Sequence, residues 1–282
     1  MKKGLVMEGG AMRGMFTAGV TDILMENSIV FDGAVGTSAG AAFGCNYKSR
    51  QIGRTIRYNK KYCRDKRFVS FRSLIFTGDL YGRDFSYRKL PDELDPFDYE
   101  AFEKNPMEFY TVSTNLGNGK AEYHKCTNGR YEDLDWIRAS ASMPLMANIV
   151  EIDGKKMLDG GVSDSVALRF MEGIGYEKNL VILTQPKGYE KMPNKFLPII
   201  KIKYRKYPEF IEAVKKRHLV YNETIKYIEK REQDGTVFVI RPESSLNIGA
   251  AEKNPDELER VYQIGRKVAE KNLEKFKEWF QG

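Results

Sequence analysis

The chain of 282 residues is poor in the side chains that several common kinds of chemistry require. Its cysteines number three, Cys45, Cys63 and Cys126, and their spacing does not resemble that of metal ligands. We therefore expect neither a disulfide framework nor a metal site, and interpret each thiol as buried or idle. Histidine is rarer still, with only His124 and His218. No apolar run approaches the ~18 residues of a membrane-spanning helix.

Targeting and low-complexity signals are also missing. The opening "MKKGLVMEGGAMRG" interrupts its apolar stretch at Glu8, too early for a signal peptide, and we find no repeat or linker. We expect a cytoplasmic protein, with contact at the inner face of the membrane as an open alternative. A hydrophobic fraction of 41% over 282 residues is sufficient for one large domain or two small ones with a buried core.

Positive charge is in excess, with a formal net charge of +7, and it is concentrated in two segments. Ten Lys or Arg residues oppose one acid between Lys48 and Arg72, and ten oppose three acids between Lys187 and Arg217. Tyrosines are interleaved with them, at Tyr58, Tyr62, Tyr204 and Tyr207. Such segments are either solvated faces or surfaces that meet an anionic membrane at headgroup depth. Nucleic acid is not an expected partner.

The first half alternates short apolar runs with helical patterns, which predicts a parallel sheet with crossover helices. "KGLVME" and "SIVFDGAVG" are expected strands, and "TAGVTDILMEN" an expected helix. Turn signals at 117–119 and 153–154 predict hairpins, so the sheet is mixed. Amphipathic helices are predicted over 209–233 and 256–280, with a strand over 236–242 between them. We expect a catalytic core over 3–185 and a mainly helical C-terminal extension over 186–282, packed on that core.

A serine stands between two glycines where a strand leads directly into a helix. The run Gly36-Thr37-Ser38-Ala39-Gly40 predicts a sharp turn that presents Ser38 at the edge of the sheet, with Gly36 and Gly40 where a side chain would clash. The N-terminus of the following helix favours negative charge at Ser38. The pattern indicates a nucleophile, although a phosphate-binding turn or a tight connection would look similar.

A second small-residue cluster follows the first strand. Gly9, Gly10 and Gly14 lie in "MEGGAMRGMF", an arrangement that directs several backbone N–H groups to one point, as in an oxyanion hole. Arg13 lies within the same loop and adds positive charge. A dinucleotide-binding loop is the alternative, but Ala11 occupies the third place of a G-x-G-x-x-G motif counted from Gly9.

An acid at the end of a strand supplies a base for the serine. Asp159 is followed at once by two glycines in "KKMLDGGVSDS", which allow close approach to another loop. We interpret His124 and His218 as structural, so direct proton transfer from Ser38 to Asp159 is the simplest hypothesis. A carboxylate needs partial desolvation for this role. The candidates for enclosing it, which are equally plausible core residues, are Met12, Met143, Leu145 and Met146.

Four stretches, in this order, resemble the patatin-like phospholipases: "EGGAMRGMFTAGV", "GAVGTSAG", "RASASMPLM" and "LDGGVSDS". The similarity extends from about Lys3 to about Gln185. It implies a three-layer α/β/α sandwich with a mixed, mainly parallel sheet, and hydrolysis of acyl esters or phospholipids without metal or organic cofactor. By position, Ser38 is the nucleophile, Asp159 the base, and the oxyanion hole is formed by the N–H groups of Gly9, Gly10 and Ala11. Many relatives have glycine at the place of Ala11.

Two other functions remain open at this point. A transacylase or thioesterase would use the same Ser-Asp dyad and the same acyl-enzyme. A basic adaptor that binds anionic lipid without catalysis is a different class, and the intact Ser38, Asp159 and glycine-rich loop argue against it. The head group, the acyl-chain length and the oligomeric state have no signature in the sequence.

Overall fold

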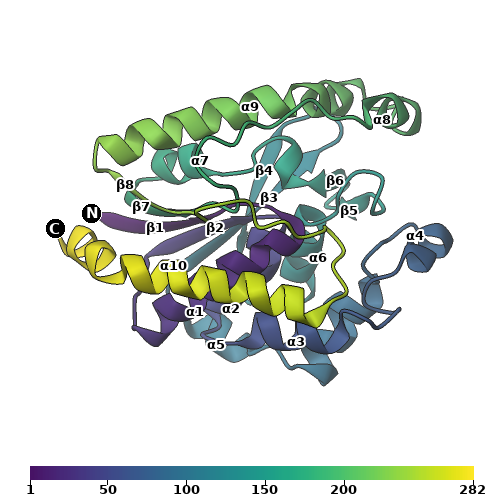
Figure 1. Ribbon diagram of the computed structural model, residues 1–282. Helices are drawn as coiled ribbons and strands as arrows, with labels where there is room; N and C mark the ends of the chain where they lie inside the picture. Colours follow the sequence, from purple (N-terminus) through teal and green to yellow (C-terminus); the bar gives the residue numbers. More distant parts are fainter.

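The computed structural model describes residues 1–282, except for the side chain of Phe71. It is built on one eight-stranded sheet with helices on both faces (Figure 1). The strands are β1 (Lys2–Met7), β2 (Gly33–Thr37), β3 (Glu108–Asn115), β4 (Ala121–Cys126), β5 (Val150–Ile152), β6 (Lys155–Asp159), β7 (Tyr176–Ile182) and β8 (Val237–Ile240). Their order across the sheet is β5-β6-β3-β2-β1-β7-β8, and β4 also pairs with β3.

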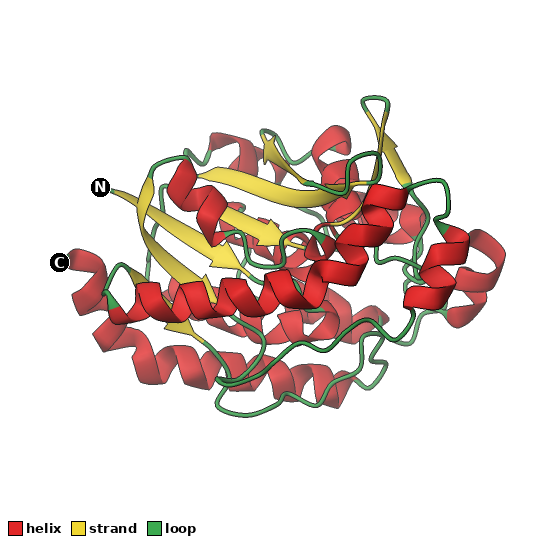
Figure 2. Ribbon diagram, turned by 90° about the horizontal axis from the view of Figure 1, so that it is seen from above, coloured by secondary structure: helices red, strands yellow, loops and turns green.

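The helices fall into two layers. Those with side chains in the larger core, below the sheet in Figure 1, are α1 (Gly14–Glu26), α2 (Ala39–Lys48), α3 (Arg54–Tyr62), α5 (Tyr99–Lys104), α6 (Tyr131–Ser140) and α10 (Pro255–Gln281). Above it lie α7 (Leu168–Gly173), α8 (Leu197–Lys203) and α9 (Pro208–Gln233). The remaining elements are α4 (Phe71–Thr77), at the edge of the molecule, the ten-residue π-helix η2 (Phe85–Leu94), and the short 3₁₀ helices η1 (Ala11–Arg13) and η3 (Gly160–Val162). In Figure 2, α9 crosses over the strands.

Five strands run parallel and three antiparallel. β1 pairs in parallel with β2 and β7, β2 with β3, and β7 with β8, whereas β4, β5 and β6 form antiparallel pairs. The expected class, an α/β sandwich with a mixed and mainly parallel sheet, is confirmed. Because parallel strands share a carboxyl edge, the loops that follow β1, β2 and β7 emerge together.

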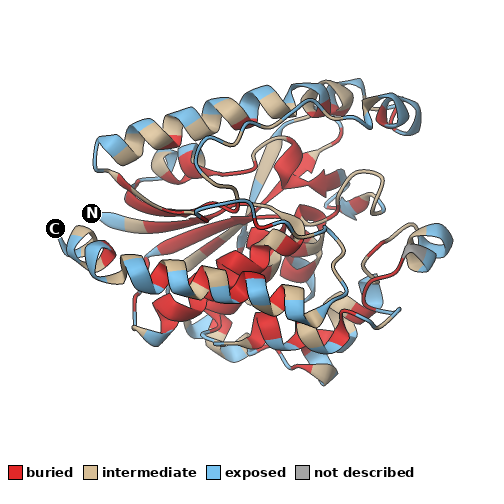
Figure 3. Cartoon of the chain, viewed as in Figure 1, coloured by how far each residue is buried: buried red, intermediate tan, exposed pale blue. Residues whose placement is uncertain are grey.

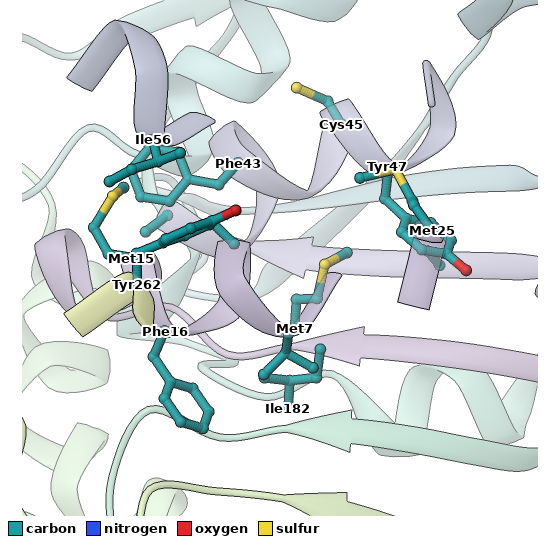
Figure 4. Packing of buried hydrophobic residues seen from close by; sticks show 14 of the residues in the cluster. Met7, Met15, Phe16, Met25, Phe43, Cys45, Tyr47, Ile56, Ile182 and Tyr262 are labelled. Atoms are coloured by element: carbon teal, nitrogen blue, oxygen red, sulfur yellow. The ribbon is translucent and has the colours of Figure 1, made fainter. Parts of the chain in front are cut away.

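Alternating side chains along the strands build the two cores. Met7 of β1 and Ile182 of β7 belong to the core shared with α1 and α2. The residues that precede them, Val6 and Val181, point to the opposite face and belong to the core under α7 and α9. Figure 4 shows Met7 pointing into the core that also contains Met15 of α1, Phe43 of α2 and Ile56 of α3. Figure 3 shows the buried strands between helices whose outer faces are exposed. This two-residue period fixes the register of each strand.

The C-terminal segment is continuous with the core. β8 extends the central sheet beside β7, and α10 packs along α1. The backbones of α10 and α1 approach each other closely at Gly265. A Cβ atom there would lie 2.1 Å from the carbonyl oxygen of Phe16. The predicted extension therefore also supplies an edge strand of the sheet.

The two basic segments differ in structure. Tyr58, Tyr62 and Tyr204 are buried, so the expectation that they lie at headgroup depth is wrong; aromatic packing draws them inward instead. Five of the ten basic residues of the first segment are buried or paired, through Lys48, Arg54–Asp95, Arg57–Asp95, Lys60–Glu259 and Arg67–Asp65. The other five are exposed and form no salt bridge among the described residues: Arg50, Lys61, Arg64, Lys66 and Arg72. The second segment keeps exposed charges at Lys201, Lys203, Arg205 and Lys206.

The three cysteines are buried free thiols, as predicted. Within the described part of the chain, none of the helices has both the length and the apolar character needed to cross a bilayer.

Candidate active site

Two strands meet end to end along one edge of β3. β4 pairs with residues 109–114 of β3, so β2 and β6, which pair with 108–112 and 113–115, share the other edge. Thr37 at the end of β2 lies opposite Val112, and Asp159 at the end of β6 lies opposite Ser113. Because the two strands run toward each other, their carboxyl ends bring Ser38 beside Asp159.

The turn at Ser38 has an unusual backbone. Ser38 adopts φ 55° and ψ −120° between β2 and α2, a conformation that costs a non-glycine residue about 1–3 kcal/mol. The flanking glycines permit the close packing of the turn. A Cβ atom on Gly36 would lie 2.3 Å from the carbonyl oxygen of Gly40, and one on Gly40 would lie 2.3 Å from that of Met7.

Ser38 and Asp159 form a hydrogen-bonded pair. The hydroxyl of Ser38 donates to Oδ2 of Asp159 at 2.7 Å, and Oδ1 accepts the N–H of Gly161 at 2.7 Å. Only 7% of Ser38 and 4% of Asp159 are exposed. Burial raises the pKa of Asp159 above its ordinary value, against the opposing effects of the Ser38 hydrogen bond and the charge of Arg217. A raised pKa makes this carboxylate a stronger base.

The loop after β1 lies directly against Ser38. A Cβ atom on Gly9 would be 3.0 Å from that of Ser38, and the N–H of Gly9 donates to the carbonyl of Ser165 at 3.3 Å. Among the described residues, no acceptor binds the N–H of Gly10 or Ala11. Ala11 has a φ of 47°, in the left-handed region that favours glycine. Gly10 and Ala11 thus present two unpaired donors near the serine.

Arg13 is held by a buried polar chain. Its Nε donates to Oγ1 of Thr184 at 3.3 Å, and Thr184 donates through both N–H and hydroxyl to Oε2 of Glu8. The other oxygen of Glu8 accepts the hydroxyl of Tyr221 at 2.8 Å. Hydrogen bonds from Thr184 and Tyr221 to Glu8 therefore connect the loops after β1 and β7 to α9, and Arg13 binds to this network through Thr184.

Ser38 lies between two hollows, which enclose about 940 and 1010 Å³ of space between atoms, open solvent included. The first, here called the apolar hollow, has among its lining residues Met12, Phe43, Tyr58, Phe68, Tyr87 and Leu134. The second, here called the cationic hollow, has among its lining residues Arg13, Leu145, Met146, Asp159, Lys191 and Arg217. Met143 lines both. All four apolar candidates from the sequence thus line one hollow or the other.

The histidines have other partners. Nε2 of His124 lies 2.9 Å from Oδ1 of Asp133, and its ring stacks on Trp136. Nδ1 of His218 is buried without a partner among the described residues. Neither histidine is among the described residues that line the two hollows.

One group of potential metal ligands, His124, Cys126 and Asp133, lies elsewhere in the fold. The second oxygen of Asp133 is already occupied by the N–H groups of Thr127, Asn128 and Gly129. Burial raises the pKa of Cys126 well above its usual value, which disfavours the thiolate that a metal requires. These residues fit a structural anchor for the loop after β4 better than a metal site.

Four further side chains at this site were not predicted from the sequence: Ser140, Thr184, Lys191 and Arg217. Ser140 accepts the N–H of Ser38 at 2.9 Å and so holds the turn, and Thr184 holds Arg13. Lys191 and Arg217 line the cationic hollow. Ser140 lies within the quoted "RASASM", whereas the two cations were indistinguishable from other members of a basic segment.

Comparison with known proteins gives two family matches. The profile described as patatin-like phospholipase matches residues 5–171, and that of a domain of unknown function, DUF6363, matches residues 207–281. The chain is 27% identical to the uncharacterized protein YjjU of Escherichia coli strain K12 over 93% of this chain and 74% of that protein.

Two fungal proteins and one solved structure are also similar to parts or most of the chain. The lysophospholipase nte1 of Aspergillus niger is 32% identical over 61% of this chain, and that of Aspergillus terreus 26% identical over 97%. The chain spans only 11% and 18% of these two proteins. The crystal structure of VipD from Legionella pneumophila has a TM-score of 0.48 at 13% identity, covering 97% of this chain and 67% of that one.

Proposed function

The chain belongs to the patatin-like phospholipase family, and we propose from this premise that it is a serine hydrolase that cleaves acyl esters of lipids. The observation that carries the proposal is the 2.7 Å hydrogen bond from the Ser38 hydroxyl to Asp159. It joins a nucleophile on a strained turn to a buried carboxylate that can take its proton.

In the first half of the reaction, Oγ of Ser38 attacks the ester carbonyl while Asp159 accepts the hydroxyl proton. Asp159 then gives this proton to the departing alcohol, which leaves an acyl group on Ser38. Water takes the position that the alcohol has left, gives a proton to Asp159 and attacks the carbonyl carbon of the acyl group on Ser38. The acid is released, and the proton returns to Ser38. These steps require no metal or organic cofactor.

The oxyanion of each tetrahedral intermediate needs donors that are fixed before the reaction. In our proposal the N–H groups of Gly10 and Ala11 supply them, since neither has an acceptor among the described residues. Gly9 belongs to the same loop, but its N–H is engaged with Ser165 and its main contribution is close approach to Ser38. Arg13 adds positive charge to this side of the site.

The apolar hollow fits an acyl chain. Its aromatic and aliphatic walls favour a hydrocarbon through the hydrophobic effect, and Ser38 is one of its lining residues. A lipid therefore binds with its tail in the apolar hollow and its head group toward the cationic hollow.

We further propose that the protein acts in the cytoplasm and docks on the anionic inner face of a membrane. Free buried thiols at all three cysteines suit a reducing compartment. Exposed apolar side chains stand on α8 and α4, at the same end of the molecule in Figure 1: Phe196, Ile199, Ile202, Ile75 and Phe76. Phe196 also lines the cationic hollow, so a bilayer at α8 would face the site.

The test is steady-state hydrolysis of a soluble short-chain ester by the wild type and by Ser38→Ala. We expect a loss of at least about 10³-fold, because alanine has no nucleophile. Ser49→Ala, at the other end of α2, is the matched control and should retain full activity. His124→Ala and His218→Ala should keep most activity. An active Ser38→Ala protein would refute the proposal.

Product analysis separates the alternatives. A hydrolase releases free acid, whereas a transacylase transfers the acyl group to an added acceptor alcohol. A thioesterase prefers the thioester of the same acid, and a lipid-binding adaptor cleaves none of these substrates.

A further inference from the structure

Three positive side chains converge on the cationic hollow beside Ser38. Arg13, Lys191 and Arg217 all line it, and Asp159 is the only carboxylate among its described lining residues. We propose that Lys191 and Arg217, with Arg13 facing them, bind the phosphate of the substrate's head group, so that phosphate-bearing monoacyl glycerol esters are preferred over neutral ones. The inference rests on the proposed hydrolase function and assigns the residues that set its selectivity for the head group.

The three cations have no acidic partners among the described residues. None takes part in a salt bridge, whereas four basic residues of the first basic segment, Arg54, Arg57, Lys60 and Arg67, do. All three are half-buried. Half-buried positive charges without partners are costly, and an incoming dianion would offset that cost.

Lys191 is positioned before any ligand binds. Its backbone N–H donates to Oδ1 of Asn222 at 2.8 Å, and its carbonyl accepts from the Asn222 amide at 3.1 Å, so α9 clamps the loop on both sides. The ammonium lies 4.2 Å from the ring centroid of Tyr221. Backbone and aromatic contacts thus hold Lys191 in place and leave the hydrogens of its ammonium for a ligand.

Arg217 connects the subsite to the dyad. Its Nε donates to the carbonyl of Gly161, whose N–H holds Asp159. One guanidinium edge is therefore used by the protein, and the remaining N–H groups are available to a phosphate oxygen, which accepts from arginine in fork geometry. Both Lys191 and Arg217 come from outside residues 5–171, and Arg217 lies within 207–281.

The two hollows together specify the ligand. The apolar hollow accepts a tail, and Ser38 lines both this hollow and the cationic hollow. A glycerophosphate head group places a phosphate a few bonds from the scissile ester. Burial and the charge of Arg217 lower the pKa of Lys191 to about 8, and a bound phosphate would raise this pKa again by favouring the charged ammonium.

The experiment compares two soluble esters that differ only in the phosphate: monohexanoyl glycerol 3-phosphate and monohexanoyl glycerol. Short chains keep both substrates monomeric, so membrane docking does not contribute. The selectivity is the ratio of kcat/KM for the phosphate ester to kcat/KM for the neutral one. It is measured for the wild type, for Lys191→Gln, and for Lys187→Gln, an exposed lysine in the same loop that makes the same change of charge.

We expect the wild type to prefer the phosphate ester and Lys191→Gln to lose about tenfold of that selectivity, equivalent to about 1.4 kcal/mol. Lys187→Gln should retain it within about twofold. Equal cleavage of both esters by the wild type, or equal selectivity in the two variants, would overturn the phosphate subsite while leaving the hydrolase function intact. If the wild type cleaves neither ester, the proposed function itself fails, and the subsite with it.

Inorganic phosphate distinguishes a head group from free phosphate as the natural ligand. A head-group subsite predicts competitive inhibition of neutral-ester hydrolysis only at millimolar phosphate, weakened further in Lys191→Gln, because free phosphate lacks the tail. Inhibition at micromolar phosphate without preference for the phosphate ester would assign the hollow to free phosphate and overturn the head-group assignment.

Discussion

The hydroxyl of Tyr221 donates a 2.8 Å hydrogen bond to the buried carboxylate of Glu8, although the two residues are 213 positions apart. Glu8 directly follows the last residue of β1. Its carboxylate also accepts a hydrogen bond from Thr184, whose hydroxyl in turn accepts one from Arg13. Helix α9, which lies outside the expected catalytic core, thus contributes through Tyr221 to the polar chain that holds Arg13 at the site. Residues 186–282 and the core therefore act as one structural unit around Ser38.

Tyr221→Phe should destabilise the fold by about 1–3 kcal/mol, because one oxygen of a buried carboxylate loses its donor. Tyr227→Phe is the matched control on the same helix: its hydroxyl binds Glu172 where the surroundings are more exposed, and a loss below about 1 kcal/mol is expected. Urea unfolding followed by circular dichroism measures both. An equal decrease in the free energy of unfolding in the two variants would show that the Tyr221–Glu8 hydrogen bond contributes no more to stability than the Tyr227–Glu172 hydrogen bond.

Backbone strain at Ser38 predicts that glycine is more stable there than alanine. Ser38→Ala keeps a side chain at φ 55° and ψ −120°, a region in which glycine alone is unstrained. We expect Ser38→Gly to be the more stable by about 1 kcal/mol, a difference in Tm of about 2–4 °C. Both variants should be inactive. Calorimetry that finds Ser38→Gly less stable would contradict the strained turn.

The carboxylate of Asp159 should oppose folding at neutral pH. Its pKa is raised in the folded state, chiefly by burial, so the folded chain holds the proton more tightly than the unfolded chain. The ionised carboxylate of Asp159 therefore lowers the free energy of unfolding at pH values above 3.8, and this cost is complete above the raised pKa of the folded state. Asp159→Asn removes this cost, and we expect its Tm to exceed that of the wild type at pH 7.

The difference in Tm should narrow as the pH falls through the raised pKa of the folded state toward 3.8, and Asp159 is protonated in both states only below that value. Asp153→Asn, in the exposed β5–β6 turn, is the control and should follow the wild type at every pH. A lower Tm for Asp159→Asn at pH 7 would mean that the burial cost is outweighed by the contacts of the carboxylate.

Membrane docking is expected to depend on α8. Each basic residue near an anionic bilayer contributes about 1 kcal/mol, and apolar side chains that enter the interface add to this. The double variant Ile199→Ser with Ile202→Ser should bind anionic vesicles several-fold more weakly in co-sedimentation. Ile174→Ser removes an exposed isoleucine from the turn before β7, at the amino edge of the sheet, and should bind normally. Equal binding by both variants would exclude α8 as the docking element.

The local parts of the site were predictable from sequence. Continuous short apolar runs mark β1 and β7, and the small residues around Ser38 mark a turn that excludes side chains. Such features depend on a few adjacent residues. Asp159 also follows from its strand end and the glycines after it.

The hollows were not predictable, because their walls form only on tertiary packing. Tyr58 lies in a segment whose charge suggests a surface, yet aromatic contact with Phe68 draws its ring inward. Lys191 and Arg217 approach Ser38 only because α9 folds back over the sheet (Figure 2). Periodicity assigns a residue to one face of a helix, but it does not indicate which distant loop that face meets.

The most direct measurement is the rate and position of covalent labelling by a fluorophosphonate, read by peptide mass spectrometry on intact folded protein. The account predicts a single adduct on Ser38 in the wild type, none in Ser38→Ala, and labelling slower by about 10²–10⁴-fold in Asp159→Asn, which cannot accept the serine proton. An adduct on another residue, or equal labelling rates in the wild type and Asp159→Asn, would contradict the Ser38–Asp159 dyad.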